Sequence, residues 1–327
     1  MLKYRYTCIV GTVYAFLVYL LYSSYDAIKR TRFFIGDSIA KSVCDKIDGA
    51  VYLDTEATWD DIPKFRKYAF GHYRWKILFT KVFAQDHFGF SSPLIGFSPY
   101  TLIEDGSGFY TYCLNEPYFA KEFGAKIFRK KIKQAILYGP TYGKNAGKNI
   151  LCRNRLVTAP TDVNSELLKG RKYELIDLEV LWKNAGVEKQ KFILDLFGID
   201  MTTLDKYSQY KVIVLTQNYV TIQAIEEDEL VEIYKKAIEE YDERDVIIKP
   251  HPNDKVPYQK YFPKAYIMPS YIPMQLMQLI GMKLDVAITI NSTAVSMFPQ
   301  ETKIVWLGGK CHPKLAKYGF NECPYRS

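Results

Sequence analysis

The second half of the chain alternates short apolar segments with amphipathic ones, and this alternation limits its possible folds more than any other feature. Segments with the length and β-branched content of buried strands lie at 211–217, 245–250, 265–269, 285–290 and 303–308. Between the first two, residues 226–241 repeat apolar side chains at intervals of three and four, as one face of a helix requires. Strands that alternate with helices form a parallel sheet with right-handed crossovers. We therefore predict a Rossmann-like domain here.

The first half shows the same alternation in weaker form. Strand candidates lie at 32–36, 50–54, 81–86 and 100–106, and the segment from about 160 to 205 is polar with helical stretches. A chain of 327 residues, 48% of them hydrophobic, is long enough for two domains. We predict an α/β fold with two Rossmann-like domains, residues 1–205 and 206–327, that face each other across a cleft. Ligands of such domains bind at the carboxyl ends of the strands.

The apolar run from Cys8 to Tyr22 permits two interpretations. With the basic residues before it, the run is similar to a signal peptide. It is short for a membrane-spanning helix, which needs about 20 apolar residues, and no small-residue cleavage signal follows it. Gly11 and Thr12 divide it into a strand and a helix, which suits the first strand, turn and helix of an α/β domain.

Lysine and arginine outnumber the acidic residues by 44 to 36, and the net charge of +8 suits anionic ligands or surfaces. Residues 125–136 mix basic and apolar side chains, as in helices that lie on anionic membranes or, more commonly, on the solvated face of an ordinary helix. The 27 tyrosines form no recognisable basic stacking surface, so we do not expect nucleic-acid binding. The six cysteines show no CxxC pair and no metal-ligand spacing, which predicts reduced thiols.

Polar residues follow two predicted strands of the first domain. Glu104 and Asp105 are adjacent carboxyls, and Gly106 after them permits a tight turn. A partly buried carboxyl beside a like charge can serve as a general base for a hydroxyl group, whereas an acidic turn with no chemical role is the commoner case. Asp86 and His87 end another strand and, with Gly106, could contact an acceptor. A turn with a structural histidine is the alternative.

His251 lies between Pro250 and Pro252 at the end of the predicted strand 245–250. The two prolines restrict the backbone on both sides of the histidine, and Lys249 adds a cation nearby. A histidine held rigidly there can donate a hydrogen bond to a phosphate or protonate a leaving group. A structural histidine in a stiff turn is the alternative.

Asn291, Ser292 and Thr293 follow the predicted strand 285–290, where we expect a helix to begin. Side chains of these types cap helix N-termini, whose free amides can bind an anion. An ordinary helix cap without a ligand explains the same residues.

The order of these motifs resembles that of the bacterial sialyltransferases, in which an acidic pair before glycine, a His-Pro motif and a Ser/Thr pair recur. The most similar family is the lipooligosaccharide sialyltransferase family, glycosyltransferase family 52. The matching stretches are 83–108, 246–252, 268–277 and 288–295, and the apolar strand and helix at the start of the chain also resemble those of the family. The resemblance favours a strand and a helix over a signal peptide, and with them a cytoplasmic protein.

The resemblance implies a GT-B fold and inverting transfer of sialic acid from CMP-sialic acid to a sugar hydroxyl, often of galactose, in a capsular polysaccharide or lipooligosaccharide. It implies no cofactor and no metal. Glu104 or Asp105 would deprotonate the acceptor, with Glu104 favoured as the first acidic position, and His251 would hydrogen-bond or protonate the departing phosphate. Ser292 and Thr293 would hold that phosphate. Further contacts to the CMP-sugar would come from Lys249, Pro252, Gln275 and Asn291.

Two departures from the family pattern leave room for another donor. Gln275 stands where many relatives have a ribose-binding glutamate, and Asn218 stands where some have a catalytic aspartate. The same fold with a UDP- or CMP-linked hexose or N-acetylhexosamine is therefore one alternative, and a noncatalytic glycan-binding subunit is another. The expected partners are a nucleotide sugar and a glycan or glycolipid acceptor. Two further partners are considered: the inner membrane face, in peripheral contact through residues 125–136, and a second copy of the chain in a homodimer.

Overall fold

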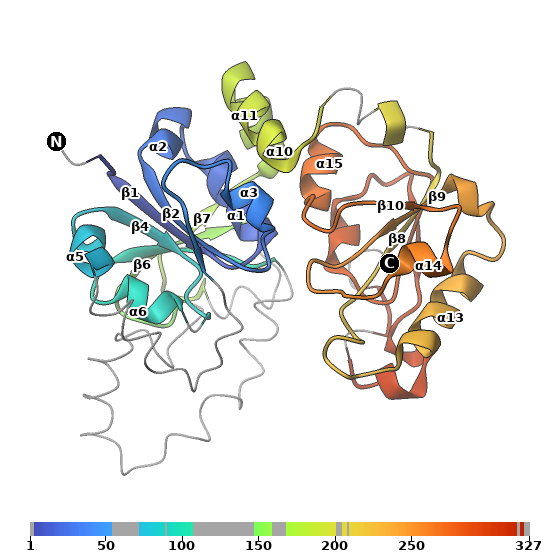
Figure 1. Cartoon of the computed structure of the whole chain (residues 1–327). Coiled ribbons are helices and arrows are strands. Elements are labelled where there is room, and N and C mark those ends of the chain that lie inside the picture. Colours follow the sequence, from blue (N-terminus) through green and yellow to red (C-terminus); the bar gives the residue numbers. More distant parts are fainter. Residues whose placement is uncertain are drawn as a thin grey trace, which may run out of the picture. The chain divides into compact units, whose positions relative to one another are not determined.

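The computed structural model describes residues 3–53, 72–88, 90–106, 147–158, 168–200, 205–207, 209–318 and 321–323. The chain divides into two compact units, Met1–Leu196 and Phe197–Ser327, and each unit contains one parallel sheet (Figure 1). We call them the N-terminal unit and the C-terminal unit. The first unit ends in the last turn of helix α11 (Val187–Phe197), before the boundary expected at Asp205.

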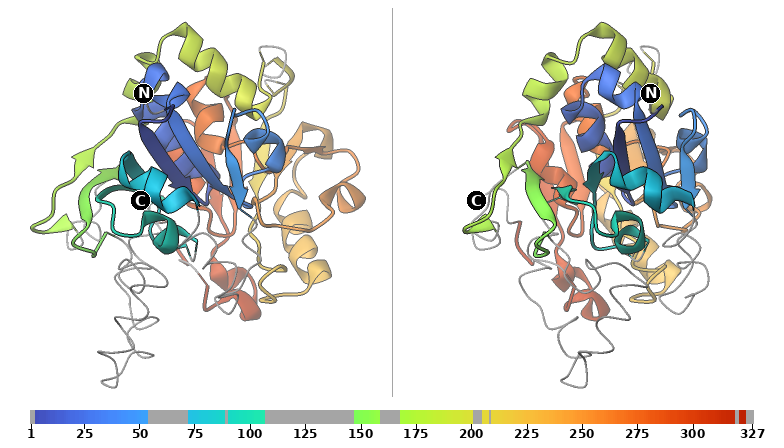
Figure 2. Two further views of the ribbon diagram at one scale, coloured as in Figure 1. Left: turned by 60° about the vertical axis from the view of Figure 1, so that its left-hand side comes forward. Right: turned by 90° about the vertical axis from the view of Figure 1, so that its left-hand side faces the viewer.

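The sheet of the N-terminal unit has the strand order β3-β2-β1-β4-β5-β6-β7, and every neighbouring pair is parallel. The strands are β1 (Tyr6–Val10), β2 (Thr31–Gly36), β3 (Val51–Leu53), β4 (Lys81–Ala84), β5 (Tyr100–Ile103), β6 (Cys152–Val157) and β7 (Glu174–Leu175). Figure 2 shows the first of these strands side by side. The order reverses between β1 and β4, which is the doubly wound pattern of a Rossmann fold.

Helices pack on both faces of this sheet because alternate residues of its strands point to opposite sides. Phe33 lies against Phe16 of α1, with ring centroids 5.8 Å apart, whereas the next residue, Phe34, shares a core with Ile77 and Leu94 of α5 and α6. The helices are α1 (Val13–Tyr22), α2 (Tyr25–Lys29), α3 (Lys41–Cys44), α5 (His72–Leu78), α6 (Ser91–Ile95), α10 (Leu178–Lys183) and α11.

The apolar run at the start of the chain forms β1 and α1, so the interpretation as a strand and a helix is confirmed. Thr12 separates them as the N-cap of α1, and its hydroxyl accepts a hydrogen bond from the Ala15 amide at 3.3 Å. Within the described ranges, no helix has both the length and the apolarity to cross a membrane. Residues 125–136 lie outside the described residues.

The C-terminal unit repeats the Rossmann pattern with the order β10-β9-β8-β11-β12, again parallel throughout. Each predicted strand is present: β8 (Val212–Leu215), β9 (Val246–Lys249), β10 (Tyr266–Ile267), β11 (Val286–Thr289) and β12 (Lys303–Trp306). The α-helices are α13 (Glu227–Ala237), α14 (Tyr258–Tyr261) and α15 (Met274–Leu279). Leu230 and Tyr234 of α13 are buried in the core that β8, β9 and β11 share, on the apolar face expected from the sequence, and Val231 is buried with them.

Short 3₁₀ helices complete this unit: η1 (Glu243–Asp245), η2 (Thr293–Met297), η3 (Gly309–Cys311) and η4 (Pro313–Leu315). The helix expected after β11 is therefore η2, a single stretch of 3₁₀ helix. β-branched residues such as Thr293 and Val295 are poor helix formers, and Pro299 follows closely after the last helical residue. A short 3₁₀ helix presents a much weaker dipole to an anion than a long α-helix does.

Candidate active site

Polar side chains gather at the carboxyl edge of the N-terminal sheet, where β1, β4, β5 and β6 end next to one another. Glu104 and Asp105 follow β5, Thr12 follows β1, His87 follows β4 and Thr158 follows β6. Hydrogen bonds, and a contact of 3.4 Å between His87 and Asp105, join residues of four strands that are far apart in the sequence. The fold thus builds one polar cluster around the acidic motif.

Glu104 is the buried member of the acidic pair, with 1% of its surface exposed. Its Oε1 accepts hydrogen bonds from the Tyr14 hydroxyl at 3.1 Å, from the Thr158 amide at 2.9 Å and from the Thr158 hydroxyl. Burial, and next the charge of Glu104, raises the pKa of Tyr14 well above its ordinary value. Tyr14 therefore keeps its proton and serves as a donor that fixes the Glu104 carboxyl.

Asp105 reaches the surface, since 22% of its side chain is exposed. Its Oδ1 accepts a hydrogen bond from the Thr12 hydroxyl at 2.5 Å, and its Oδ2 lies 3.4 Å from Nε2 of His87. Because Thr12 is the N-cap of α1, the Asp105 carboxylate lies at the positive end of that helix. The structure thus brings His87 and Asp105 together and leaves part of the Asp105 carboxyl accessible.

Gln85 holds the turn between β1 and α1 that presents Thr12 to Asp105. Its Oε1 accepts hydrogen bonds from the amides of Gly11 at 2.7 Å and Thr12 at 3.1 Å, and its Nε2 donates to the Thr12 hydroxyl at 3.0 Å. Gly11 is required there because a Cβ would come within 2.5 Å of the Phe88 ring. Four residues of the cluster were not predicted as site residues from the sequence: Thr12, Tyr14, Gln85 and Thr158. Thr12, Gln85 and Thr158 each lie one or two residues beyond the carboxyl end of a strand, whereas Tyr14 lies inside α1.

Asp86 does not face this cluster, although it follows the same strand as His87. It is buried, and its Oδ2 accepts hydrogen bonds from the Tyr100 hydroxyl and from the Gly147 amide, both at 2.7 Å. These bonds tie Asp86 to the loop before β6, which suits a structural residue. Gly106 has a φ of +85°, and a Cβ there would meet no atom within 4 Å. Its backbone conformation, rather than crowding, accounts for the glycine.

In the C-terminal unit, His251 lies in a turn at the carboxyl end of β9. The Asp254 amide donates to the His251 carbonyl at 2.9 Å. Thr216, just after the neighbouring strand β8, accepts the His251 amide at 3.1 Å and donates to Oδ2 of Asp254 at 2.6 Å. The Tyr258 hydroxyl also donates to this oxygen, at 2.7 Å. The turn is therefore held by hydrogen bonds as well as by its two prolines.

The imidazole of His251 is oriented by its own turn. The Asn253 amide donates to Nδ1 of His251 at 3.1 Å. A nitrogen that accepts this bond carries no proton, so the neutral ring has its proton on Nε2. The geometry therefore selects the tautomer in which Nε2 is a hydrogen-bond donor.

Lys249 ends β9 directly before this turn, and only 7% of its surface is exposed. Its Nζ donates to the carbonyls of Pro250 at 3.0 Å and Ser270 at 2.8 Å. Burial lowers the pKa of Lys249 to about 7. Lys249 thus ties the His251 turn to the segment before α15. Pro252 is exposed in the same turn.

Asn291, Ser292 and Thr293 follow β11, the other neighbour of β8. Oδ1 of Asn291 accepts the Tyr219 hydroxyl at 2.7 Å, and its Nδ2 donates to the Tyr318 carbonyl at 3.2 Å. Ser292 caps η2, and Thr293 is the first residue of η2. Gln275, partly exposed in α15, lies on the helix that packs against η2. The Tyr219–Asn291 bond spans the point where the strand order reverses, which is where Rossmann domains bind ligands.

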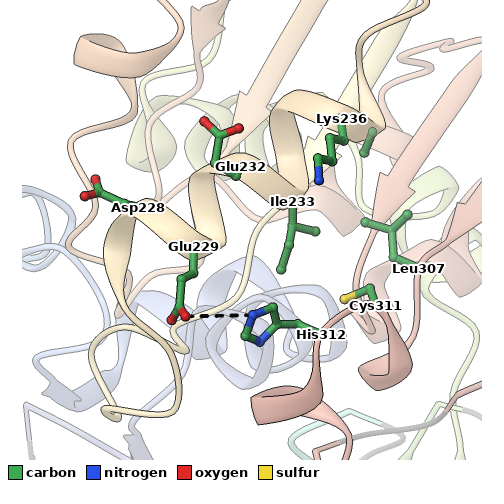
Figure 3. A pocket seen from close by; sticks show the side chains of 9 residues that line it. Asp228, Glu229, Glu232, Ile233, Lys236, Leu307, Cys311 and His312 are labelled. Carbon is green, nitrogen blue, oxygen red and sulfur yellow. Dashed lines mark ion pairs between the residues drawn. The ribbon is translucent and has the colours of Figure 1, made fainter.

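A hollow of about 620 Å³ lies elsewhere in the C-terminal unit, between α13 and the segment after β12 (Figure 3). Glu229 lies 3.9 Å from Nε2 of His312 at its rim. None of the residues predicted from the sequence lines this hollow. Among the described residues, no group of three or more His, Cys, Asp or Glu side chains is arranged to hold a metal ion.

Comparison with known proteins identifies the family of this two-unit architecture. The sequence profile of Glycosyltransferase family 52 matches residues 90–308, which include the acidic motif, the His251 turn and Ser292. The chain belongs to glycosyltransferase family 52. This family 52 glycosyltransferase is 30% identical over 243 residues to an uncharacterized protein of Haemophilus influenzae, with 73% of this chain and 72% of that protein covered.

Solved structures confirm the fold of this family 52 protein. A sialyltransferase from Photobacterium damsela matches with a TM-score of 0.50 and 16% identity over 92% of this chain and 74% of its own. The GT-B domain of a sialyltransferase from the same species matches with a TM-score of 0.50 and 15% identity, over 91% and 89%. The predicted α/β GT-B fold is confirmed, and membership of the family implies a nucleotide sugar and an acceptor as partners.

Proposed function

We propose that this glycosyltransferase is an inverting, metal-independent sialyltransferase that moves sialic acid from CMP-sialic acid to a sugar hydroxyl, such as that of galactose, in a capsular polysaccharide or lipooligosaccharide. Membership of family 52 and the likeness in fold to two sialyltransferases support it. One observation carries it: each unit gathers polar side chains at the carboxyl edge of its own sheet. The N-terminal unit offers an accessible carboxylate, and the C-terminal unit offers a hydrogen-bond donor in an ordered turn.

Asp105 is the proposed base. A base must come within hydrogen-bond reach of the acceptor hydroxyl, and Asp105 is the carboxyl of the pair that reaches the surface. Glu104, favoured from the sequence, is buried beneath three donors. Asp105 would take the hydroxyl proton while the acceptor oxygen bonds to the anomeric carbon of sialic acid. Glu104 would support the cluster through Tyr14 and Thr158, and His87 would orient the Asp105 carboxylate.

His251 is the proposed stabiliser of the leaving group. As the bond between the anomeric carbon and the phosphate oxygen breaks, negative charge grows on CMP, and the Nε2 proton of His251 can donate to it. A neutral ring that gave this proton away entirely would become an imidazolate, which is far too basic. We therefore assign His251 hydrogen bonding rather than proton transfer. Ser292 and Thr293 would hold the same phosphate, with Lys249, Pro252, Gln275 and Asn291 shaping the nucleotide site.

The proposed location is the cytoplasm, with peripheral contact at the inner membrane face. Residues 125–136, which the sequence suggested for this contact, lie outside the described residues. A homodimer is compatible with the proposal.

Nucleotide release tests the donor. The purified chain is incubated with a galactoside and, in turn, CMP-sialic acid, UDP-glucose and UDP-N-acetylglucosamine. We expect CMP release and an inverted anomeric configuration in the product. Asp105→Asn should lower kcat by about 10²-fold or more, whereas the matched change Asp195→Asn at an exposed position of α11 should not. Turnover of a UDP-sugar without turnover of CMP-sialic acid would sink the proposal and favour the hexose or N-acetylhexosamine alternative that the uncharged Gln275 keeps open.

A further inference from the structure

Large apolar side chains are exposed at the edge of the N-terminal sheet opposite the acidic motif. Phe79, Phe97 and Ile150 come just before β4, β5 and β6, which are consecutive neighbours in the sheet. Their exposed fractions are 72%, 53% and 83%, and Leu78 is 40% exposed. Parallel strands begin at the same edge and lie about 4.8 Å apart. These residues therefore share one edge, at the end of the sheet where β1 begins near the label N in Figure 1.

Basic side chains continue this row across β1 and β2. The Arg5 amide donates to the Arg30 carbonyl at 2.9 Å, and the Lys81 amide donates to the Arg5 carbonyl at 3.0 Å, so the three residues are neighbours along the edge. All three side chains are exposed, and none forms an ion pair with another described residue. We call these residues the amino-edge patch: Arg5, Arg30, Leu78, Phe79, Lys81, Phe97 and Ile150.

Two acidic residues of the same unit, Asp26 and Asp48, have lysine partners. Asp26 lies 2.9 Å from Lys29, and Asp48 lies 3.2 Å from Lys3. Lys29 is the main cause of the lowered pKa of Asp26, and the charge of Arg30 adds to it less. Arg5, Arg30 and Lys81 therefore leave the edge positively charged. Two copies of the chain that met through this edge would place these cations against one another, which opposes a symmetric dimer.

Exposed aromatic and aliphatic side chains beside exposed cations match the surface of an anionic bilayer. The apolar side chains can enter the boundary between headgroups and acyl chains, while the cations stay with the lipid phosphates. We propose that the amino-edge patch binds an anionic lipid surface. The carboxyl edge then faces away from the bilayer, at about 17 Å for a strand of five residues such as β1. If the proposed function holds, the acceptor sugar lies on a part of its glycan that extends away from the membrane.

Vesicle binding by the full chain tests the patch directly. Co-sedimentation is measured with vesicles of phosphatidylcholine alone and of phosphatidylcholine mixed with phosphatidylglycerol. We expect binding to the mixed vesicles and weak binding to the neutral ones. Each basic residue near an anionic surface is worth about five-fold in affinity, so Arg5→Glu with Lys81→Glu should weaken binding by about 25-fold or more. Phe79→Ser with Ile150→Ser should weaken it by about ten-fold.

Matched controls separate the patch from general effects of charge and apolarity. Val180→Ser changes a side chain of α10 that is 49% exposed, and Lys283→Glu reverses an exposed charge in the C-terminal unit. Both should bind vesicles like the unchanged chain. CMP release without vesicles should be the same in all variants, so a failure of the proposed reaction is distinct from a failure of the patch.

Three results would overturn the proposal. The patch variants could sediment like the unchanged chain, which would place any lipid contact elsewhere. The unchanged chain could bind neutral and anionic vesicles equally, which would contradict the role of the cations. It could also bind neither while the Phe79 and Ile150 variant converts a dimer to a monomer in light scattering, which would make the patch a contact between copies.

Discussion

The two carboxyls of the acidic motif are neighbours in the sequence but have different surroundings. Glu104 is 1% exposed and is fixed by Tyr14 and Thr158. Asp105 is partly exposed and meets Thr12 and His87 at the start of α1. Successive residues after a strand point in different directions, so one carboxyl enters the interior and the other reaches the surface. Glu104→Gln should therefore reduce the free energy of unfolding more than it reduces kcat. Asp105→Asn should reduce kcat more than the free energy of unfolding. Denaturant unfolding measures the stability, and nucleotide release measures kcat.

The tautomer of His251 predicts which substitution keeps activity. Glutamine carries an amide N–H at about the distance of Nε2, whereas alanine carries no donor. His251→Ala should lower kcat by about 10²-fold, the usual cost of removing one donor to a developing anion. His251→Gln should recover part of that loss. Activity of the unchanged chain should also persist as the pH rises above the range where histidines lose their charge.

A general acid gives the opposite pattern for His251. The rate would then fall with rising pH, and glutamine would be as inactive as alanine, since an amide cannot supply a proton. The neighbouring titratable groups Lys249, Asp254 and Tyr258 should be checked by repeating the pH profile in His251→Gln. A change of rate with pH that persists in this variant is caused by one of these neighbouring groups and not by His251.

Lys249 predicts a pH dependence of stability. Above its ordinary pKa of 10.5 the amine is neutral in the folded and unfolded chain, and below its folded pKa of about 7 it is charged in both. Between these values the unfolded chain binds a proton that the folded chain does not, so the free energy of unfolding rises with pH. The slope reaches at most about 1.4 kcal/mol per pH unit. Urea unfolding should show a smaller slope in Lys249→Met, and no such change in the exposed control Lys283→Met.

At the level of elements, Gln85 couples the turn between β1 and α1 to the acidic motif. Gln85→Leu would leave the buried Gly11 amide and the Thr12 amide without their acceptor, at about 1–3 kcal/mol for each unsatisfied group. We expect a lower unfolding midpoint in urea and a lower kcat, because Thr12 no longer holds Asp105 in place. Gln85→Glu keeps the acceptor and should retain more stability. Equal stability of Gln85→Leu and the unchanged chain would contradict this role.

At the scale of elements, the local sequence pattern correctly predicted those helices and strands in which apolar residues dominate. β1 and α1 followed from Gly11 and Thr12 within an apolar run, and β8 to β12 from their β-branched segments. β6 was missed because it contains Arg153 and Arg155. Arg155 is nevertheless buried, and its guanidinium donates to the carbonyls of Gly147 and Lys172. Such a strand depends on tertiary partners that no local pattern contains.

The residues of the candidate site were likewise predictable from the sequence only in part. Glu104, Asp105 and His251 were predictable because each follows a recognisable strand. Tyr14 and Thr158 were not, because their contact with Glu104 depends on the order of β1, β5 and β6 in the sheet. The sequence also could not separate Asp86 from His87, since the partners that bury Asp86 are Tyr100 and Gly147.

At the scale of the whole molecule, the proposed function gives each unit a different role. Each has its own parallel sheet and buried core, and each presents polar residues at the carboxyl edge of that sheet. The nucleotide is assigned to the C-terminal unit and the acceptor base to the N-terminal unit. Binding of CMP alone should therefore stabilise the residues at the carboxyl ends of β8, β9 and β11 and leave the contacts of Glu104 unchanged.

Hydrogen exchange on the full chain, with and without CMP, tests this division. A ligand stabilises what it binds by about 2.7 kcal/mol at one hundred times its dissociation constant, so exchange should slow at the amides that hold the site. We expect this at residues 216–219, 249–254 and 290–293, with little change at Thr158. UMP and the His251→Ala chain serve as controls and should give weaker protection. If protection instead centres on α13 and residues 307–312, the hollow beside Glu229 and His312 (Figure 3) is the nucleotide site, and the assignment of His251 to the phosphate is wrong.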